Sequence, residues 1–294
     1  MSNLILGASG NIGIYLIKKN RSTIFTYNSR KIKGGIKFDI KKNDISKIVN
    51  KYKVKSIAFL TAISDPNYCF KNKIRSKNIN VSKTKKILKF LIQKNIYFIF
   101  FSSEFIYDGK KGFYKEDDEA NPVNEYGKQK LEIEKFIVKN AKNYSIFRIA
   151  KTYSSALSDK TLISNFLSKL SAGQKYFPAA TDQIFSPLYV RDLKKIVYFF
   201  LKKKICGIYN VCGPSKYSRY QILKILKSNL NHKLKKKILL KKKKLKDFKY
   251  LDKRPLNVSM SNKKLQKILN FKMSKFNDIA KGVMVKSKIN EKIS

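Results

Sequence analysis

Residues that build disulfides and metal sites are scarce in this chain of 294 residues, which has no tryptophan, one histidine and three cysteines. Cys69, Cys206 and Cys212 form no C-x-x-C pair, and their odd number argues against a disulfide framework or a zinc site. His232 stands in a lysine-rich stretch, where a solvated side chain is expected, because a metal site needs three or four donors. We therefore expect a reducing compartment, no metal, and no catalysis by histidine.

Acidic residues and arginine are also scarce, although the formal net charge is +47. Arginine, which suits bidentate contacts with phosphates and bases, supplies only seven of the 66 basic residues, the rest being lysine. A chain rich in lysine, isoleucine, asparagine, phenylalanine and tyrosine is typical of drift in an A+T-rich genome. The run Lys233–Lys246 lacks interleaved aromatic residues for base stacking, so we expect a solvated helix face or loop there. No specific nucleic-acid partner is predicted.

Long apolar runs are absent as well. The run Ile196–Leu201 is too short to cross a bilayer, and Leu4–Leu6 near the N-terminus is too short for a signal peptide. The hydrophobic content of 43% is nevertheless enough to bury a sizeable core. We expect a soluble cytoplasmic protein with no membrane partner.

Short apolar runs alternate with amphipathic, lysine-spaced segments in the first half of the chain. Runs of this kind, bounded by Gly, Asn or Ser, are typical of strands buried on both faces, and segments such as Lys83–Gln93 have apolar residues at helical spacing. The alternation predicts an α/β fold with a doubly wound parallel sheet. The expected strands are Leu4–Leu6, Thr23–Tyr27, Ile36–Phe38, Ile57–Leu60, Tyr97–Phe101, Ile146–Phe147 and Gly207–Val211, and later helices are expected over Leu162–Ser171, Val190–Lys203, Asn262–Leu269 and Phe276–Val283.

A glycine-rich turn, Gly7-Ala-Ser-Gly10-Asn-Ile-Gly13, directly follows the first expected strand and precedes a helical pattern. A chain that turns around a pyrophosphate needs glycine where its backbone approaches the ligand and where the helix packs on the sheet. The position of the turn favours a dinucleotide over a merely structural role. The predicted contacts are Gly7, Ser9, Gly10, Asn11, Ile12 and Gly13.

The end of the second strand decides between the two nicotinamide cofactors. An acidic residue there would take both ribose hydroxyls of NAD, but the sequence has Ser29 and Arg30 instead. Because arginine can bind a 2′-phosphate, NADP(H) is favoured, and NAD(H) stays open as the second choice. The alternative is that Arg30 is simply solvated.

A tyrosine, a lysine and a serine make up the predicted catalytic group. Tyr126 and Lys130 are four residues apart, which on a helix places both on one face, and Ser103 follows the strand Tyr97–Phe101, with Asn80 on the preceding helix. A tyrosine hydroxyl can protonate the oxygen of a ketone that accepts hydride, while an ammonium lowers the pKa of the tyrosine and a serine donates a second hydrogen bond. The alternative is a structural or vestigial motif.

Further motifs cover most of the chain and extend this pattern. The glycine turn has the spacing G-x-x-G-x-x-G, and the other segments are Phe101–Gly109, Tyr114–Asp117, Pro122–Glu134, Thr181–Pro187, Gly207–Gly213 and Lys253–Met260. Together they resemble the extended short-chain dehydrogenases/reductases, and among these the sugar-nucleotide 4-keto reductases that include dTDP-4-dehydrorhamnose reductase.

The resemblance implies roles for individual residues. Ser103 takes the place of the family's catalytic Thr or Ser, Tyr126 that of the acid, and Lys130 that of the ribose-binding lysine. Asp39 and Ile40 are expected at the adenine, and Thr61 and Ala62 beside the nicotinamide. The residues expected to contact the substrate are Glu104, which stands where the family usually has Asp, with Gln183 and Arg254.

The resemblance also implies a division of the chain. Residues 1–150 would form the NADP-binding Rossmann domain, with 186–213 packing back onto it, and 151–185 and 214–294 would form a smaller substrate-binding lobe. The expected function is NADPH-dependent reduction of the 4-keto group of a nucleotide-activated 6-deoxysugar, for surface polysaccharide precursors. A homodimer stays open as the assembly.

Two departures leave the sugar nucleotide open. Rhamnose enzymes carry Q-x-G where this chain has Asn11-Ile-Gly13, and the segment Thr61–Cys69 does not match their usual sequence. The regulatory subunit of methionine adenosyltransferase, which binds the cofactor but serves as a partner protein, shows the same motifs and is the main alternative. A sugar-nucleotide epimerase or dehydratase, which would hold NAD tightly, is a further alternative.

Overall fold

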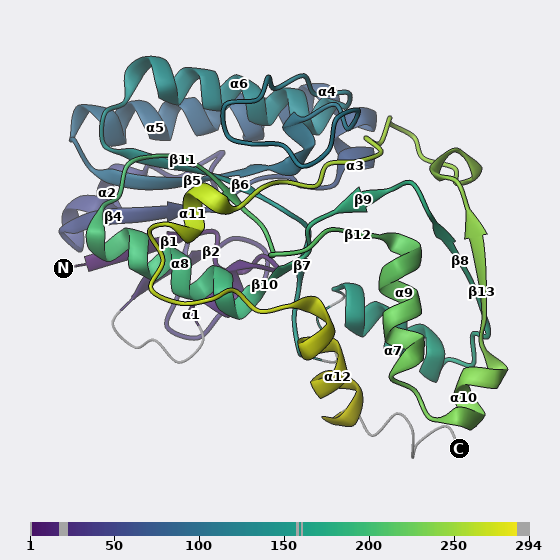
Figure 1. The fold of residues 1–294 in the computed structure, drawn as a ribbon. Coiled ribbons are helices and arrows are strands. Elements are labelled where there is room, and N and C mark those ends of the chain that lie inside the picture. Colours follow the sequence, from purple (N-terminus) through teal and green to yellow (C-terminus); the bar gives the residue numbers. More distant parts are fainter. Residues whose placement is uncertain (1, 18–22, 157–158, 160, 287–294) are drawn as a thin grey trace.

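The computed structural model describes residues 2–17, 23–156, 159 and 161–286. Its centre is a seven-stranded sheet in the order β3-β2-β1-β4-β5-β6-β11, in which every neighbouring pair is parallel (Figure 1). The predicted doubly wound Rossmann fold is therefore confirmed. The strands are β1 (Ser2–Leu6), β2 (Ile24–Tyr27), β3 (Ile36–Lys37), β4 (Val54–Phe59), β5 (Tyr97–Ser103), β6 (Tyr144–Ile149) and β11 (Gly207–Val211).

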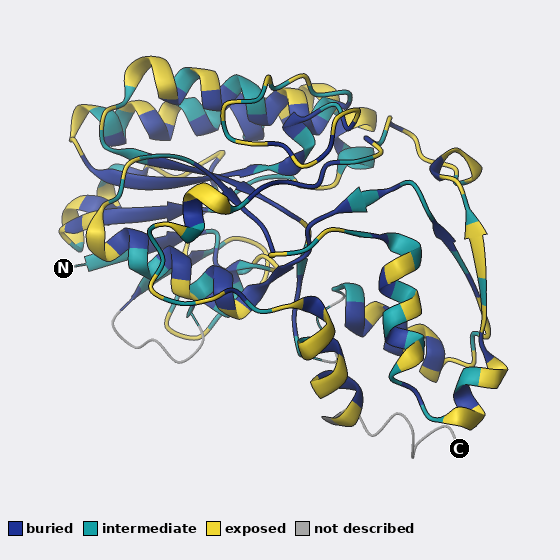
Figure 2. Cartoon of the chain, viewed as in Figure 1, coloured by how far each residue is buried: buried dark blue, intermediate teal, exposed yellow. Residues whose placement is uncertain are grey.

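Helices cover both faces of this sheet. On one face α2 (Ile45–Lys51), α5 (Thr84–Gln93) and α6 (Glu125–Asn140) share an apolar core with β4 and β5. On the other face α1 (Gly13–Ile17) and α8 (Val190–Lys203) pack together, and α11 (Lys263–Gln266) contacts β11. With both faces covered, the central strands are buried along almost their whole length (Figure 2), which is why their sequences lack alternation.

The chain leaves the sheet after β6 and returns to it between residues 186 and 213. The short strand β10 (Leu188–Tyr189) pairs with β7 (Thr152–Tyr153), α8 then lies against β4 and β5, and β11 pairs with β6. The predicted helices Leu162–Ser171 and Val190–Lys203 and the strand Gly207–Val211 are confirmed residue for residue.

The remaining elements form a smaller lobe beside the carboxyl ends of the strands (Figure 1). Its helices are α7 (Leu162–Ser171), α9 (Arg219–Ser228), α10 (His232–Lys237) and α12 (Phe276–Lys286). Its strands form two ribbons, β8 (Tyr176–Ala180) with β13 (Leu239–Lys243) and β9 (Ile184–Phe185) with β12 (Tyr217–Ser218).

The expectation of a solvated helix face or loop over Lys233–Lys246 is partly wrong. Residues 232–237 are helical, but β13 pairs in parallel with β8 over five residues, and a 3-10 turn, η3 (Leu245–Asp247), follows. Backbone pairing, which needs no apolar face, holds this strand, and Leu239 stays 60% exposed. The helix expected over Asn262–Leu269 is limited to the four residues of α11, whereas α12 extends beyond the expected Phe276–Val283.

A segment of residues 252–262, here called the return segment, runs from the small lobe back to the sheet. Its Asn257 N–H donates to Gly109 O at 2.9 Å, and Tyr114 exchanges backbone hydrogen bonds with Ser259 and Ser261. A side chain at Gly112 would overlap Asn257, since a Cβ there would lie 2.2 Å from the Asn257 amide. The two lobes are thus joined by contacts between residues nearly 150 positions apart.

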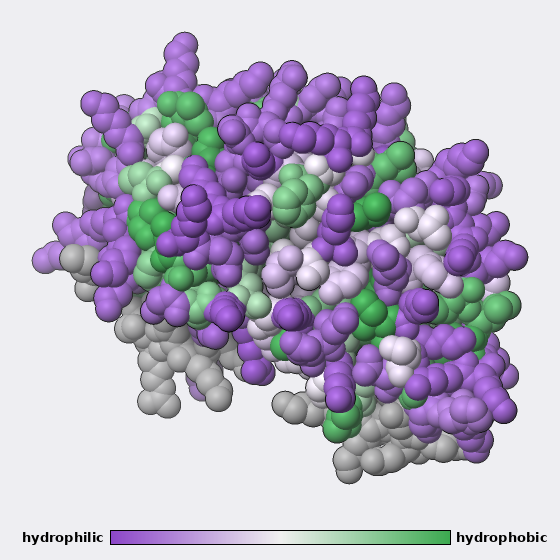
Figure 3. Space-filling view, in the orientation of Figure 1, coloured by the Kyte–Doolittle hydropathy of each residue, from purple (hydrophilic) through white to green (hydrophobic). Residues whose placement is uncertain are grey.

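The surface is largely hydrophilic, with apolar residues in small scattered groups on the face shown in Figure 3. In the part of the chain that the structure describes, no helix combines the length and the apolar character that a membrane span requires. Four further helical segments lie around the site described next. They are α3 (Pro66–Lys71), α4 (Lys73–Lys77), the π-helical η1 (Asn78–Lys83) and the 3-10 turn η2 (Glu104–Ile106).

Candidate active site

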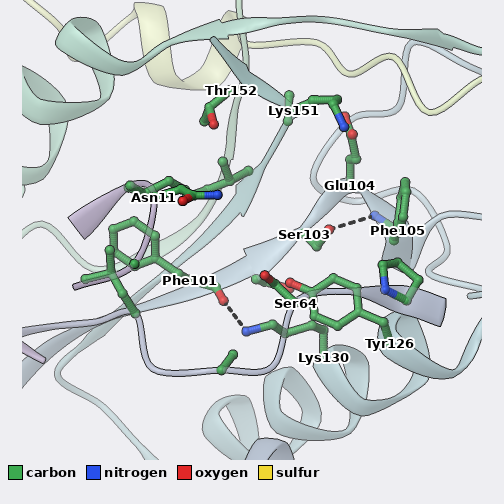
Figure 4. A pocket seen from close by; sticks show the side chains of 18 of the residues that line it. Asn11, Ser64, Phe101, Ser103, Glu104, Phe105, Tyr126, Lys130, Lys151 and Thr152 are labelled. Carbon is green, nitrogen blue, oxygen red and sulfur yellow. Dashed lines mark hydrogen bonds between the residues drawn. The ribbon is translucent and has the colours of Figure 1, made fainter. Parts of the chain in front are cut away.

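A cavity of about 540 Å³ lies at the carboxyl ends of β1, β4, β5 and β6, where parallel sheets bind ligands. The structure brings most of the predicted site residues to its wall, as the close view in Figure 4 illustrates. The predicted residues that line it are Gly7, Gly10, Asn11, Ile12, Gly13, Ala62, Ser103, Glu104, Tyr126, Lys130, Gln183 and Arg254.

The positions of the glycine turn require glycine for different structural reasons. Gly7 has φ +94°, and a Cβ there would lie 2.7 Å from Thr61 Oγ1; a Cβ at Gly13 would lie 2.6 Å from Ala8 Cα. These two positions are closed by the protein's own packing. Gly10 is different, because a Cβ there would meet only Gly7 O, at 3.6 Å, and the residue lines the cavity. The turn thus keeps its backbone open to a ligand at Gly10, as a pyrophosphate-binding turn requires.

The residues expected at the adenosine end lie outside the cavity wall. Arg30 is exposed, and its Nη2 donates to Ser9 O at 2.7 Å, so its guanidinium lies beside the glycine turn. The Asp39 carboxylate accepts the Lys41 N–H at 2.9 Å. Ser9, Ser29, Ile40 and Thr61 likewise do not line the cavity, and Thr61 packs beneath Gly7.

The predicted catalytic side chains converge from two elements. Ser103 is the last residue of β5, and its Oγ accepts the Phe105 N–H at 3.2 Å. Tyr126 and Lys130 occupy successive turns of α6, whose first turn is capped by the Asn124 side chain. Lys130 Nζ donates to Phe101 O at 2.7 Å (Figure 4). Because all three side chains face one cavity, they can act on one bound molecule.

Burial dominates the electrostatics of these residues. It raises the pKa of Tyr126 above its ordinary value, and a hydrogen bond with Ser103 acts in the opposite direction. Burial also lowers the pKa of Lys130 to about 8, against the charge of Glu134, which raises it. The expectation that the Lys130 ammonium lowers the tyrosine pKa is not met, because Nζ lies 5.7 Å from the ring centroid and is engaged by Phe101 O.

Charged residues gather at the other end of the cavity. Arg219 Nε donates to Gln183, Arg254 Nη2 donates to Asn67 Oδ1 at 2.6 Å, and the Arg254 guanidinium lies over the Tyr250 ring. Lys151 faces Glu104 there (Figure 4), and desolvation together with the charges of Arg219 and Arg254 lowers its pKa to about 8. Three cations against one carboxyl make this end suited to an anionic ligand.

Glu104 is the carboxyl in that group and is 5% exposed, with no hydrogen-bond partner for Oε2. Burial raises its pKa to about 8, while the Lys151 ammonium and backbone N–H and the Arg219 charge act to lower it. The carboxyl therefore keeps its proton well into the neutral range.

A test of this state is the pH dependence of stability. Between pH 4.5 and 8 the folded chain holds a proton on Glu104 that the unfolded chain has released, so wild type loses stability as pH rises through this range. The Glu104→Gln variant lacks this loss. In urea denaturation, the free energy of unfolding of the variant minus that of wild type should increase by about 1 kcal/mol or more from pH 4.5 to 8. A difference that is constant with pH would contradict the assignment.

Sequence reasoning missed Lys151, Arg219, Tyr250, Ser64 and Thr152. Lys151 stands two residues beyond the end of β6 (Tyr144–Ile149), and the shorter strand expected there, Ile146–Phe147, did not single it out among the other lysines. Arg219 could have been singled out, because arginine is scarce in this chain and binds phosphate groups well. Tyr250 carries no local signal. Among the described residues, no group of three or more His, Cys, Asp or Glu side chains is placed to hold a metal ion.

The model of the RmlD substrate binding domain family matches residues 1–288. The chain belongs to this family. Methionine adenosyltransferase 2 subunit beta of Xenopus tropicalis is similar to it at 26% identity over 159 residues, 49% of this chain and 45% of that protein. The chain thus spans about half the length of this curated relative. The dTDP-4-dehydrorhamnose reductase of Aggregatibacter actinomycetemcomitans is 25% identical over 230 residues, 74% of this chain and 75% of that enzyme.

Solved structures of RmlD-type reductases share the fold. A hypothetical dTDP-4-dehydrorhamnose reductase from Sulfolobus tokodaii has a TM-score of 0.80 at 26% identity, covering 95% of this chain and 99% of that one. The dTDP-4-dehydrorhamnose reductase of Bacillus anthracis str. Ames, solved in complex with NADP, has a TM-score of 0.81 at 18% identity, covering 97% and 99%. The resemblance to extended short-chain reductases seen in the sequence is confirmed.

Proposed function

We propose that the protein is an NADPH-dependent reductase of the 4-keto group of a nucleotide-activated 6-deoxysugar. The observation that carries the proposal is the single cavity that joins the open backbone of Gly10, the group Ser103, Tyr126 and Lys130, and a basic end at Arg219 and Arg254. Membership of the RmlD substrate binding domain family supports it.

The cofactor, when bound, supplies hydride to the ketone carbon. Tyr126 protonates the ketone oxygen, and its high pKa keeps the phenol protonated in the absence of ligand. Ser103 donates a hydrogen bond to the same oxygen. Lys130 would hold the ribose. Its pKa of about 8 lets its ammonium exchange protons with solvent near neutral pH, so it can relay a solvent proton to Tyr126 through an intervening hydroxyl or water.

The basic end of the cavity would bind the pyrophosphate of the sugar nucleotide through Arg219 and Arg254, with Gln183 fixing the Arg219 side chain. A second cavity of about 370 Å³ shares Arg219 and Tyr250 with the first. Aromatic residues in its wall, Phe166, Phe177 and Phe248, suit a nucleobase. The nucleotide part is therefore assigned to the small lobe, the arrangement implied by the proposed substrate-binding role of residues 151–185 and 214–294.

Preference for NADPH over NADH is assigned to Arg30, which the Ser9 carbonyl holds beside the glycine turn. The Arg30→Ala variant is expected to lose about 1.5–3 kcal/mol of this preference, the range for a charge-assisted hydrogen bond to phosphate. Dissociation constants for both cofactors, measured by fluorescence titration of wild type and variant, test it. Equal affinities in wild type would refute the assignment.

The decisive experiment on function is NADPH oxidation with a panel of 4-keto-6-deoxysugar nucleotides that differ in base. We expect turnover with at least one member and none with the free sugar, because the basic end binds the pyrophosphate. Product stereochemistry by NMR would then distinguish reduction alone from epimerisation. A cytoplasmic homodimer is part of the same proposal, to be tested by cell fractionation and light scattering.

The second candidate is a non-catalytic cofactor-binding partner protein. Its support is the similarity to methionine adenosyltransferase 2 subunit beta, which covers about half of each chain. That candidate predicts NADPH binding with no turnover on any member of the panel, together with complex formation with a methionine adenosyltransferase catalytic subunit.

A further inference from the structure

Gln129 lies on α6 between Tyr126 and Lys130 but does not line the cavity, and it is 2% exposed. Its Oε1 accepts a hydrogen bond from Asn80 Nδ2 at 2.8 Å. Its Nε2 donates to Ser76 Oγ at 2.9 Å and to Glu125 Oε1 at 3.1 Å. Both amide hydrogens and the carbonyl are used, so the orientation of the side chain is fixed by its partners.

Asn80 continues the chain of hydrogen bonds to the opposite side of the site. Its Oδ1 accepts the Ile63 N–H at 2.8 Å, and its Nδ2 donates to Ile63 O at 2.9 Å. One side-chain amide thus holds both backbone groups of one residue. Ile63 stands between Ala62 and Ser64, which line the cavity. Two buried side chains therefore connect the loop after β4 to the catalytic helix.

A π-helical segment places Asn80 for this contact. Residues 78–83 form η1 between α4 and α5. Thr84 Oγ1 donates to Ile79 O at 2.9 Å, which satisfies one backbone carbonyl of η1. Wide turns of this kind are uncommon and occur frequently at functional sites. Here the turn brings a buried asparagine within reach of both Ile63 and Gln129.

We propose that Gln129 is a positioning residue that sets α6, and with it Tyr126 and Lys130, at a fixed distance from the loop of residues 61–64. The inference rests on the proposed reductase function and adds to it a residue that touches neither cofactor nor substrate. A fully satisfied buried network is rigid, and a misplacement of about 1 Å at a catalytic group can cost 10²-fold in rate.

The first test is the Gln129→Leu variant, which keeps the volume and removes all three hydrogen bonds. We expect kcat to fall about 10- to 100-fold with KM for NADPH changed less than about threefold. The matched control is Lys128→Met, an exposed neighbour on the same helix, which should match wild type. Wild-type kcat in a folded Gln129→Leu variant would overturn the proposal.

The second test uses the Gln129→Glu variant, and it can be carried out even if the Gln129→Leu variant does not fold. When protonated, the new carboxyl can accept from Asn80 and donate to Ser76 or Glu125; when ionised, it can donate to neither and faces Glu125. The ratio of kcat in the variant to kcat in wild type should therefore fall at least about fivefold as pH rises from 5.5 to 8. A ratio that does not change with pH would overturn the proposal.

Amide hydrogen exchange separates this inference from the proposed function, because it needs no substrate. The Ile63 N–H is protected by Asn80, so exchange in residues 61–64 should accelerate at least about tenfold in Gln129→Leu and not in Lys128→Met. Faster exchange in Gln129→Leu, together with no turnover by the wild-type protein, would support the positioning of the loop by Gln129 and refute the reductase function. Unchanged exchange in an active enzyme would refute the positioning role alone.

Discussion

Replacing Tyr126 by phenylalanine is expected to lower kcat by about 10²–10⁴-fold while NADPH affinity stays within a few-fold of wild type. The phenol is the only group assigned to deliver a proton to the ketone oxygen, and the glycine turn is untouched by the change. Stopped-flow NADPH oxidation with the best substrate of the panel gives kcat, and fluorescence titration gives the affinity.

The matched control is Tyr209→Phe, which removes a phenol on β11 that bonds Cys206 O and does not line the cavity. This variant should keep wild-type turnover. Turnover near wild type in Tyr126→Phe would mean that the proton comes from another group, and Ser103 would be the next residue to replace.

The Lys130→Met variant should lose both rate and cofactor affinity, each by about 10- to 100-fold. The same ammonium is assigned to the cofactor ribose and to reprotonation of Tyr126, so one substitution removes two interactions. Dissociation constants for NADPH and single-turnover rates at saturating cofactor separate the two effects. Lys128→Met, which removes an exposed ammonium two residues away, is the control.

A loss of rate alone in Lys130→Met would show that the side chain does not contact the ribose. In wild type, the pKa of Lys130 near 8 gives a further readout, since the affinity for NADPH should fall as pH rises through 8 and the ammonium loses its charge. The variant should lack that dependence.

Most of the sheet could be predicted because parallel strands covered on both faces are continuous apolar runs, and the segment Tyr97–Phe101 is buried throughout. The ribbon of β8 and β13 could not. Its backbone hydrogen bonds carry no sequence pattern, and the lysines of Leu239–Lys243 resemble those of any solvated segment. Two-residue strands such as β7 are likewise too short for periodicity to show.

The candidate site divides in the same way. Gly10, Ser103 and Tyr126 stand in local motifs, and the cavity brings all three together. Lys151 and Tyr250 stand in no such motif. One lysine among 59, or one tyrosine among 17, looks like the others until the fold places it beside the cavity. The pKa of Tyr126 could not be foreseen from the spacing to Lys130 alone, since it depends on burial and on the partner that the ammonium takes.

The return segment bears on the order in which the protein is made. Residues 109–114 leave the ribosome early, but their hydrogen-bond partners at 257–261 are synthesised almost 150 residues later. The seven strands need only the first 211 residues, whereas the cavity wall includes Tyr250 and Arg254. Contacts between distant parts of a chain form late because loop closure must come first. A nascent chain can therefore complete its sheet well before it can complete its site.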